Sequence, residues 1–499
     1  MKINRSNIWN KLELISLIGM LLVGFLQICS LTFGKKIISY CLWPTLIIGF
    51  IVCLHNLITI KKFKKDKLLG FLLLFILTYI ISIFLNFNYG YYDNLRTLVW
   101  FTMLVFIAYL NNSMHDDKSK NLYTIIIVYL LGVFILNVFS FYTMLSGTWS
   151  FVLPKVSQTA PVYYLGFVWG RLYGVYWDAN IGATMCAICI ILSLEFIIKS
   201  NKKWMQLFGV ISIILSFFYI VFSDSRTGLL GLVAGLFFWF LLRIFKSKSV
   251  ILNLCKVFCI VVITIGANFG FKSLFNYLQE QGITHIEVHT VEDNTFTNFD
   301  INQNLNGVAT EDKQAKSNQT NVETNKVTTG QQPKENEKKD QANNVGRSDE
   351  YKSDISNRRF DIWKSAIEIF NTKPLFGVTH NNVIKYTKEN LPNTYIINNN
   401  HQEFDSMHNT FLDILVSQGL FGELTYLSIV GFIIIKMILN RKIIFENANE
   451  FCTPIALFFC MMAVSCVMTE IVYVTSPMAT MLWLYIRKFM EEIKNAENS

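Results

Sequence analysis

Residues 406–424 read SMHNTFLDILVSQGLFGEL and mark the point where a long hydrophilic stretch returns to apolar sequence. His408 and Asn409 stand at the start of the helix that the following apolar positions predict. Gly419 and Gly422 predict a notch of small residues that allows close helix packing. An imidazole fixed where water meets apolar sequence can accept a proton, or it can simply cap and solvate a helix end. The composition, topology and motifs of the rest of the chain bear on the choice between these two interpretations.

The composition predicts an all-α polytopic membrane protein. The chain has 499 residues, of which 52% are hydrophobic and only 16% are charged, and its mean hydropathy is +0.38. A soluble protein of this size would carry more charge and fewer long apolar runs. All ten cysteines fall in apolar segments, and no Cys/His metal spacing appears. We therefore expect neither a disulfide framework nor a metal site.

About twelve apolar runs are long enough, at roughly 17–25 residues, to cross a bilayer as helices. Lysine and arginine gather in the loops on one side of this topology, and they include the run at 61–67. By the positive-inside rule this side is cytoplasmic, and both termini lie on it. The net charge of +9 mostly reflects this topology, so we expect no nucleic-acid partner. The predicted spans are 13–33, 37–60, 68–87, 95–110, 121–145, 181–198, 204–223, 228–245, 250–271, 412–438, 452–474 and 475–490.

These spans divide the chain into three parts. Residues 1–271 hold the first nine helices, 272–407 form one large extracellular loop, and 408–499 hold the last three helices. Within the loop, 294–356 is rich in Asn, Gln, Lys, Thr and Glu, and this composition predicts disorder. Residues 358–371 place apolar side chains at helical intervals, which predicts an amphipathic helix on the outer membrane surface.

Several polar groups face the predicted outer side together with His408. Arg226 lies in the hairpin SDSRTG at 223–228, and Arg358 and Arg359 begin the amphipathic helix. Guanidinium groups at a helix N-terminus suit phosphate oxygens. Each also has a plainer interpretation, as a snorkelling interfacial arginine or as the solvated end of a surface helix.

Aromatic and polar residues alternate in the smaller outer loop, at 146–180. Such aromatics usually form an interfacial belt, although sugars also stack on their rings. Ionisable residues in or near the spans are costly and often functional; they are Asp413, Glu423, Lys436 and Glu470. We predict surface roles for the loop histidines, which are His285, His289, His380 and His401.

Outward arginines for a phosphate and an outward histidine base describe an enzyme with a lipid-linked phosphate donor and a hydroxyl acceptor. A nucleotide sugar is not available outside the cell, so the leaving group has to arrive on a lipid. The sequence contains no Walker loop, Rossmann glycine pattern, HExxH or GxSxG motif. Nucleotide-driven transport and hydrolysis of the soluble type therefore have no support.

Five motifs in this order resemble the O-antigen ligase/polymerase family of bacterial membrane glycosyltransferases. They are GRLYG at 170–174 followed by Asn180, SRTG at 225–228, Arg359 with Trp363 ahead of PLFG at 374–377, HNTF at 408–411, and GLFG at 419–422. The resemblance covers roughly 170–430 and implies a helical bundle of the GT-C type. The long polar insertion before Arg358 departs from the family's pattern, so the loop geometry does not carry over.

The resemblance also implies the substrate and the roles of the site residues. The donor is an oligosaccharide linked to undecaprenyl pyrophosphate, which Arg226 and one of Arg358 and Arg359 bind. His408 acts as base on the acceptor hydroxyl, or orients it, and the reaction inverts the anomeric carbon without a metal or other cofactor. The candidate glycan ligands are Arg171, Trp177, Asn180 and Asn409.

The family contains polymerases, ligases to the lipid A core and protein oligosaccharyltransferases. The residue usage is typical of an AT-rich bacterial genome, and the large loop has no cysteine, which fits a Gram-positive cell without lipid A. We therefore favour a plasma-membrane polymerase for capsule or exopolysaccharide, with a chain-length regulator as a candidate partner. The alternatives are a ligase to a cell-wall, lipid or protein acceptor, and a flippase of lipid-linked oligosaccharide. The flippase is disfavoured because the two halves look unlike and the ionisable groups concentrate on one side.

Overall fold

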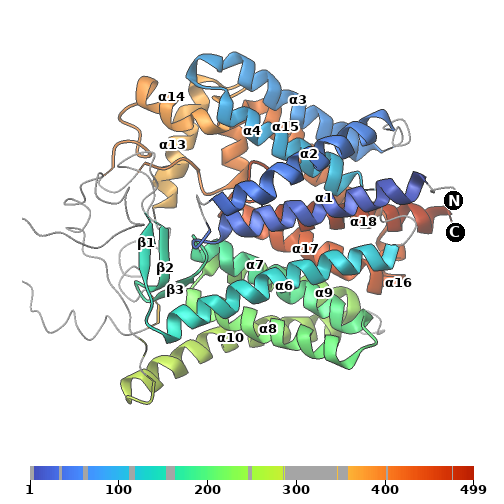
Figure 1. Cartoon of the computed structure of the whole chain (residues 1–499), viewed down its shortest axis with the longest axis vertical. Coiled ribbons are helices and arrows are strands. Elements are labelled where there is room, and N and C mark those ends of the chain that lie inside the picture. The colour runs from blue at the N-terminus through green and yellow to red at the C-terminus, as the bar shows by residue number, and fades with distance from the viewer. Residues whose placement is uncertain are drawn as a thin grey trace, which may run out of the picture.

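The computed structural model describes residues 5–32, 36–59, 66–111, 118–152, 163–244, 250–284, 286, 345–346, 358–399, 403–474 and 476–498. Helices make up most of the described chain (Figure 1). Apart from Val345 and Gly346, the segment 294–356, for which disorder is predicted, lies outside the described residues. The first half of the chain contains α1 (Arg5–Ile28), α2 (Lys36–Ile58), α3 (Lys67–Leu85), η2 (Phe87–Tyr89), α4 (Tyr92–Met103), η3 (Leu104–Tyr109), α6 (Lys118–Leu145), β1 (Ser150–Val152), β2 (Tyr163–Val168), β3 (Arg171–Gly174), α7 (Ala179–Lys199), α8 (Lys203–Ser223) and α9 (Arg226–Ile244). The second half contains α10 (Val250–Glu280), α13 (Arg359–Thr372), η5 (His380–Asn382), α14 (Val383–Asn390), α15 (Thr410–Leu439), α16 (Arg441–Glu446), α17 (Ala448–Ser465) and α18 (Pro477–Asn498).

Ten of the described helices are long and apolar enough to cross a membrane: α1, α2, α3, α6, α7, α8, α9, α10, α15 and α17. They correspond to ten of the twelve predicted spans and confirm an all-α polytopic membrane protein. The other two predicted spans, 95–110 and 475–490, are also helical. They fold as α4 with the π-helical turn η3, and as α18, whose sequence mixes charged and apolar residues.

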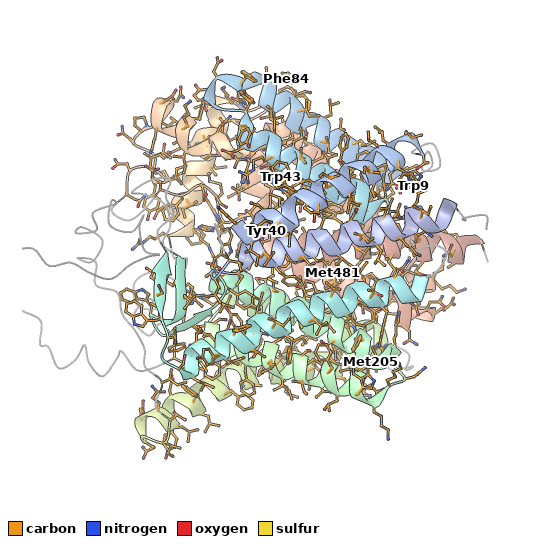
Figure 2. All side chains as sticks on the ribbon, in the orientation of Figure 1. Trp9, Tyr40, Trp43, Phe84, Met205 and Met481 are labelled. Carbon is orange, nitrogen blue, oxygen red and sulfur yellow. The ribbon has the colours of Figure 1, made fainter. Side chains whose placement is uncertain are left out.

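The outside of the bundle is apolar, as lipid contact requires. On α2, the side chains of Tyr40 and Trp43 are 74% and 63% exposed, and Phe84 on α3 is 74% exposed. Figure 2 shows these side chains on the outside of the ribbon. Exposure of so many large apolar side chains to water is unfavourable in free energy, whereas their exposure to the hydrocarbon of a membrane is not.

The interior of the bundle is organised around α7, which packs against α8, α9 and α17. Small residues allow this close packing. Gly231 and Gly235 on α9 lie against Cys460 of α17, and a Cβ at either glycine would collide with neighbouring side chains. This small-xxx-small spacing lets two membrane helices approach backbone to backbone.

The two ends of the bundle differ in what they carry (Figure 1). One end, here called the loop end, holds β1, β2, β3, α13 and α14. The opposite end, here called the terminal end, holds the start of α1 and the end of α18. All polar motifs singled out in the sequence, from GRLYG to HNTF, lie at the loop end or lead into it.

The segment 146–180, which the sequence predicts to be the smaller outer loop, contains a β-sheet that the sequence analysis did not predict. Its three antiparallel strands have the order β1-β2-β3, with a register shift between Gly166 and Phe167. The strands have three, six and four residues, too short for a clear alternating pattern. The chain after β3 is fixed to the end of α1, because Ser30 donates its backbone N–H to Val175 O at 2.8 Å.

The loop end has its own small hydrophobic core. The predicted amphipathic helix forms as α13, and its buried face of Ile362, Ala366 and Ile369 packs with Met407 and Val416. Met407 directly precedes His408, so this second core holds α13 against the start of α15. The core is separate from the main hydrophobic cluster between the membrane helices.

Gly419 breaks α15 instead of supplying a helix-packing notch. Its φ of 65° and ψ of −162° lie outside the helical region, and a conformation with positive φ favours glycine. The segment 374–379 docks into the break and satisfies the backbone groups that the helix leaves unpaired. The four bonds run from Val378 N to Val416 O, from Thr379 N to Ser417 O, from Leu420 N to Pro374 O and from Phe421 N to Leu375 O, at 2.8–3.3 Å. The PLFG and GLFG motifs are thus two halves of one backbone joint.

Candidate active site

The turn that carries His408 is held by the N-terminus of α15. Asn409 is the N-cap residue, and its side-chain oxygen accepts from the N–H groups of Phe411 and Leu412 at 3.0 and 3.2 Å. Its amide nitrogen donates to Cys466 O at 3.0 Å. The side chain of Asn409 is therefore engaged in capping, and a role as glycan ligand stays a prediction.

Asp413, on the first turn of α15, anchors the turn that carries His408 through hydrogen bonds. Its buried carboxylate accepts from Met407 N at 2.8 Å, from Ser406 Oγ at 2.9 Å and from the hydroxyl of Thr469. Ser406 Oγ in turn accepts from His408 N at 3.1 Å. His408 adopts a φ of 49°, a strained value for a residue with a side chain, and these bonds hold it there. The sequence identified Asp413 only as an ionisable residue near a span.

Arg359 lies close enough to His408 to act on its charge. Trp363, one helical turn after Arg359 on α13, donates its Nε1–H to Met407 O at 3.1 Å. Burial of the imidazole and the positive charge of Arg359 lower the pKa of His408 below its ordinary value of 6.5. The carboxylates of Asp178 and Asp405 oppose this shift only in part. The ring is therefore mostly neutral near pH 7 and can accept a proton.

The neighbouring arginine, Arg358, precedes α13 with a φ of 64° and has no effect on the pKa of His408 comparable to that of Arg359. Of the two arginines that the sequence could not separate, Arg359 is the one whose charge lowers the pKa of His408. Which of them contacts a donor stays a prediction.

The GRLYG and SDSRTG motifs meet at a second cluster of the loop end. Arg171 is buried; its Nε donates to Ser223 O at 2.8 Å and its Nη2 to Asn180 Oδ1 at 3.1 Å. Ser225 Oγ also donates to Asn180 Oδ1, at 2.9 Å. Arg171 and Asn180 thus brace the hairpin immediately before Arg226, which is exposed at the first position of α9.

Asp178 links this cluster to His408. Its side chain caps α7 by accepting from Asn180 N at 2.7 Å and Ile181 N at 3.0 Å. The same carboxylate affects the pKa of His408 and that of Glu470. Trp177, beside it, is partly buried against the main core, and its expected contact with a glycan is untested.

Glu470 is a further ionisable group of this region. Because α17 ends at Ser465, before the predicted boundary at 474, Glu470 lies in the loop between α17 and α18. Burial and the negative charge of Asp178 raise the pKa of Glu470 to about 8, against the effect of a hydrogen bond from Ser476. Its carboxyl is therefore largely protonated at neutral pH.

His380 is not the surface residue that we predicted. Its ring stacks on Tyr473 with centroids 4.4 Å apart, and its Nδ1 is buried. Burial lowers the pKa of His380 to about 4, although Asp405 acts in the opposite direction. The negative charge of Asp405 thus acts on the pKa of both His380 and His408. Because burial outweighs it in each case, the loop end contains two mostly neutral imidazoles. The other predicted surface histidines of the loop, His285, His289 and His401, lie outside the described residues.

The arrangement combines a neutral base with cationic groups at the end of a membrane-embedded bundle. His408 can take a proton from a hydroxyl, while Arg359 favours an anion beside it. Among the residues that the structure describes, no group of three or more His, Cys, Asp or Glu side chains is placed to hold a metal ion.

Part of the chain is similar to known proteins. Residues 211–427 match the family model described as O-Antigen ligase. The match runs from α8 to the first half of α15, so it includes Arg226, Arg359 and His408 but not Arg171. A curated protein of Haemophilus influenzae, described as an uncharacterized protein, is 29% identical over 134 residues. These are 25% of this chain, and the chain spans 32% of the length of that relative.

Proposed function

We propose, because residues 211–427 belong to the O-antigen ligase family, that this chain polymerises lipid-linked oligosaccharide repeat units. The observation that carries the proposal is the half-buried, mostly neutral imidazole of His408, which lies within electrostatic range of the positive charge of Arg359. A transferase that uses a lipid pyrophosphate donor needs this pairing of a base with an anion-binding group.

In the proposed reaction the bond between the anomeric carbon and the pyrophosphate oxygen breaks as the acceptor hydroxyl attacks that carbon. A new glycosidic bond forms, and attack from the opposite face inverts the anomeric centre. The hydroxyl proton passes to His408, and undecaprenyl pyrophosphate leaves with the bonding electron pair. Arg226 and Arg359 stabilise the negative charge that develops on the leaving group.

The carbohydrate chains are proposed to contact the region between β3 and α7. Arg171, Trp177 and Asn180 border it, and Asn409 at the start of α15 is proposed as a further contact, although the hydrogen bonds of Arg171, Asn180 and Asn409 also brace the scaffold. Arg358 is proposed as a secondary contact for the pyrophosphate. A chain-length regulator is the proposed protein partner.

The proposed setting is the plasma membrane of a Gram-positive bacterium, with the loop end outside and both termini in the cytoplasm. The support is the distribution of lysine and arginine in the predicted loops. In this orientation residues 272–407 form the extracellular loop between the membrane helices of 1–271 and 408–499. The product would be capsular or exopolysaccharide.

A second candidate is a ligase that transfers the finished glycan to a cell-wall, lipid or protein acceptor. The description of the matching family favours it, since that description names a ligase. A ligase uses the same base and the same pyrophosphate site and differs only in the acceptor. A flippase of lipid-linked oligosaccharide would not require a base at the loop end.

The test is an assay of the purified full-length chain with undecaprenyl-pyrophosphate-linked repeat units, resolved on a glycan gel. We expect a ladder of products from the wild type and none from His408→Ala. Transfer of single glycans to an added acceptor, without a ladder, would establish the ligase instead. An unchanged ladder from a folded His408→Ala variant would refute the role of the base.

A further inference from the structure

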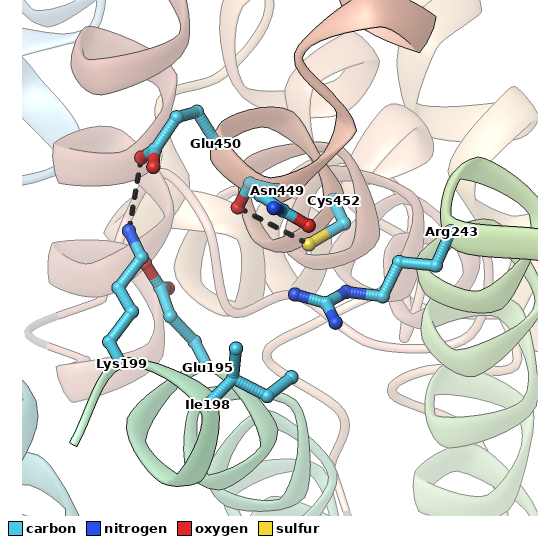
Figure 3. Close-up of a pocket in the computed structure, with 7 residues that line it drawn as sticks. All are labelled: Glu195, Ile198, Lys199, Arg243, Asn449, Glu450 and Cys452. Atoms are coloured by element: carbon cyan, nitrogen blue, oxygen red, sulfur yellow. Dashed lines mark hydrogen bonds and ion pairs between the residues drawn. The ribbon is translucent and has the colours of Figure 1, made fainter. Parts of the chain in front are cut away.

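A small pocket lies at the terminal end, far along the bundle from the candidate active site. It has a volume of about 140 Å³ and is lined by Glu195, Ile198, Lys199, Arg243, Asn449, Glu450 and Cys452. These residues come from the last turns of α7 and α9 and the first turn of α17. Figure 3 shows the pocket between these helix ends.

Arg243 supplies the unsatisfied charge of the pocket. Its guanidinium points into the space between the helix ends (Figure 3) and stacks on Trp239, 4.4 Å from the ring centroid. Its Nε is buried and has no hydrogen-bond acceptor. Within the described part of the chain, Arg243 forms no ion pair with a carboxylate. A half-buried cation without a counterion is unfavourable unless a ligand supplies one.

The two carboxylates of the pocket are already neutralised by lysines. Glu195 pairs with Lys199 at 2.9 Å and with Lys488 at 3.3 Å. Glu450 pairs with the same two lysines, at 3.0 and 3.3 Å. Two carboxylates thus face two lysines, and Arg243 leaves the pocket with one positive charge in excess.

A second feature of the pocket also favours an anion. Asn449 and Glu450, in the first turn of α17, line the pocket, and Asn447, the N-cap residue of this helix of 18 residues, makes no side-chain capping bond. A helix N-terminus with free N–H groups attracts phosphate and other anions. Here it lies opposite the guanidinium, so both would act on one ligand.

The opening of the pocket suits a ligand with an apolar tail. Ile198 lines the pocket and is 46% exposed on the perimeter of the bundle. The side chains of Lys199 and Glu450 at the mouth are 35% and 44% exposed. Because α7 and α9 end here, this level corresponds to the headgroup region of a membrane around the bundle.

We infer that this pocket binds the phosphate group of an anionic ligand, and that the favoured source is a phospholipid headgroup. The phosphate lies between Arg243 and the N-terminus of α17, and an acyl chain extends past Ile198. The site is independent of glycosyl transfer and would anchor α7, α9 and α17 to one lipid.

The test measures the thermal unfolding midpoint of the full-length chain in a neutral detergent. Three additions are compared: phosphatidylglycerol, phosphatidylcholine and inorganic phosphate. We expect phosphatidylglycerol to raise the midpoint, because a ligand that binds only the folded chain stabilises it. Arg243→Gln should weaken this binding about ten- to a hundredfold, the loss typical of a charge-assisted hydrogen bond.

Arg441→Gln is the matched control, since it removes an exposed guanidinium at the same end but outside the pocket. It should keep the full shift with phosphatidylglycerol, and Arg243→Lys should keep part of it. Because each variant is compared with itself in phosphatidylcholine, a general loss of stability does not imitate loss of the site. A shift with inorganic phosphate that depends on Arg243 would support the phosphate site and make free phosphate its source. An equal phosphatidylglycerol shift in wild type and Arg243→Gln would overturn the inference.

Discussion

The two ends of the bundle use charge in different ways. At the terminal end, Glu195 is bound directly by Lys199, Lys488 and the hydroxyl of Tyr485, at 2.7–3.3 Å. Around His408 at the loop end, the carboxylates of Asp178 and Asp405 instead act through space on a titratable ring. Direct pairing neutralises charge and holds helices together, whereas indirect interaction sets the proton affinity of a group that can still react.

The largest effect is expected from His408→Ala, which removes the base at the loop end. Rates of glycosyl transfer should fall by about 10²–10⁴-fold, the range typical of a general base, with little change in the unfolding midpoint. His55→Ala is the matched control, because this ring stacks on Trp9 in another part of the bundle. A similar loss of activity in both variants would mean that the assay reports folding.

At the terminal end, Glu195→Gln should chiefly affect stability. It removes the buried partner of Lys199 and Lys488, which keep only the half-exposed Glu450, and breaking a buried pair typically costs about 3–5 kcal/mol of the free energy of unfolding. Glu450→Gln is the control, since its side chain is 44% exposed and an exposed pair contributes about 0–1 kcal/mol. Thermal unfolding of the purified variants measures both. Equal losses of stability in the two variants would show that the buried Glu195 contributes no more than the half-exposed Glu450.

The backbone joint in α15 is expected to have an intermediate effect. Gly419→Ala places a Cβ at a φ of 65° and against the backbone of Leu375, so a loss of roughly 1–3 kcal/mol is expected. Gly431→Ala lies on the same helix with nothing within 4 Å of the added carbon, and it should be neutral or slightly stabilising. Unfolding midpoints compare the two. If Gly419→Ala unfolds at the same midpoint as the wild type, then neither the positive φ at Gly419 nor the close contact with 374–379 requires glycine at this position.

The smallest effects concern pH. Transfer by the wild type should rise with pH through the pKa of His408, which lies below 6.5, because the neutral ring is the base. Arg359→Gln removes a positive charge that lowers this pKa, so the acid limb of kcat/KM should move to higher pH. Asp405→Asn removes a negative charge that raises it, so the limb should move to lower pH. The second shift should be smaller, since Asp405 is exposed and screened by solvent.

These pH profiles also separate electrostatics from substrate binding. Arg359→Gln is expected to lower the rate because the donor binds more weakly. A lower rate alone therefore does not show that Arg359 acts on the pKa of His408. A displaced acid limb shows that the guanidinium acts on the imidazole. If the acid limb of kcat/KM lies at the same pH in the wild type, Arg359→Gln and Asp405→Asn, then His408 is not the group whose titration the limb reports.

Much of the fold could be predicted because membrane helices follow local rules. Length and hydropathy locate the spans, and the helical spacing of apolar residues in 358–371 predicts the amphipathic helix α13. The sequence did not identify its buried face, which is formed by Ile362, Ala366 and Ile369. The polar hairpin that ends at Arg226 is equally readable, since charged residues between two apolar runs have to leave the membrane. In each case the decisive information lies within a few turns of chain.

The site was only partly predictable because its contacts join distant segments. Asp413 holds Thr469 and the turn before His408, and His380 stacks on Tyr473. No local pattern indicates either contact. The β-sheet beside α7 was missed for a related reason, since short strands depend on their pairing and not on their own periodicity.

The sequence by itself determined that this chain is a helical membrane protein with arginine and histidine motifs at one end. Hydropathy, charge asymmetry and helical periodicity are properties of neighbouring residues, so they need no folded structure to be read. Only the tertiary structure decided that α15 breaks at Gly419, and that burial and the charge of Arg359 lower the pKa of His408, which leaves its ring mostly neutral. Those outcomes depend on burial and on charges brought together from separate helices, and both arise only when the bundle packs.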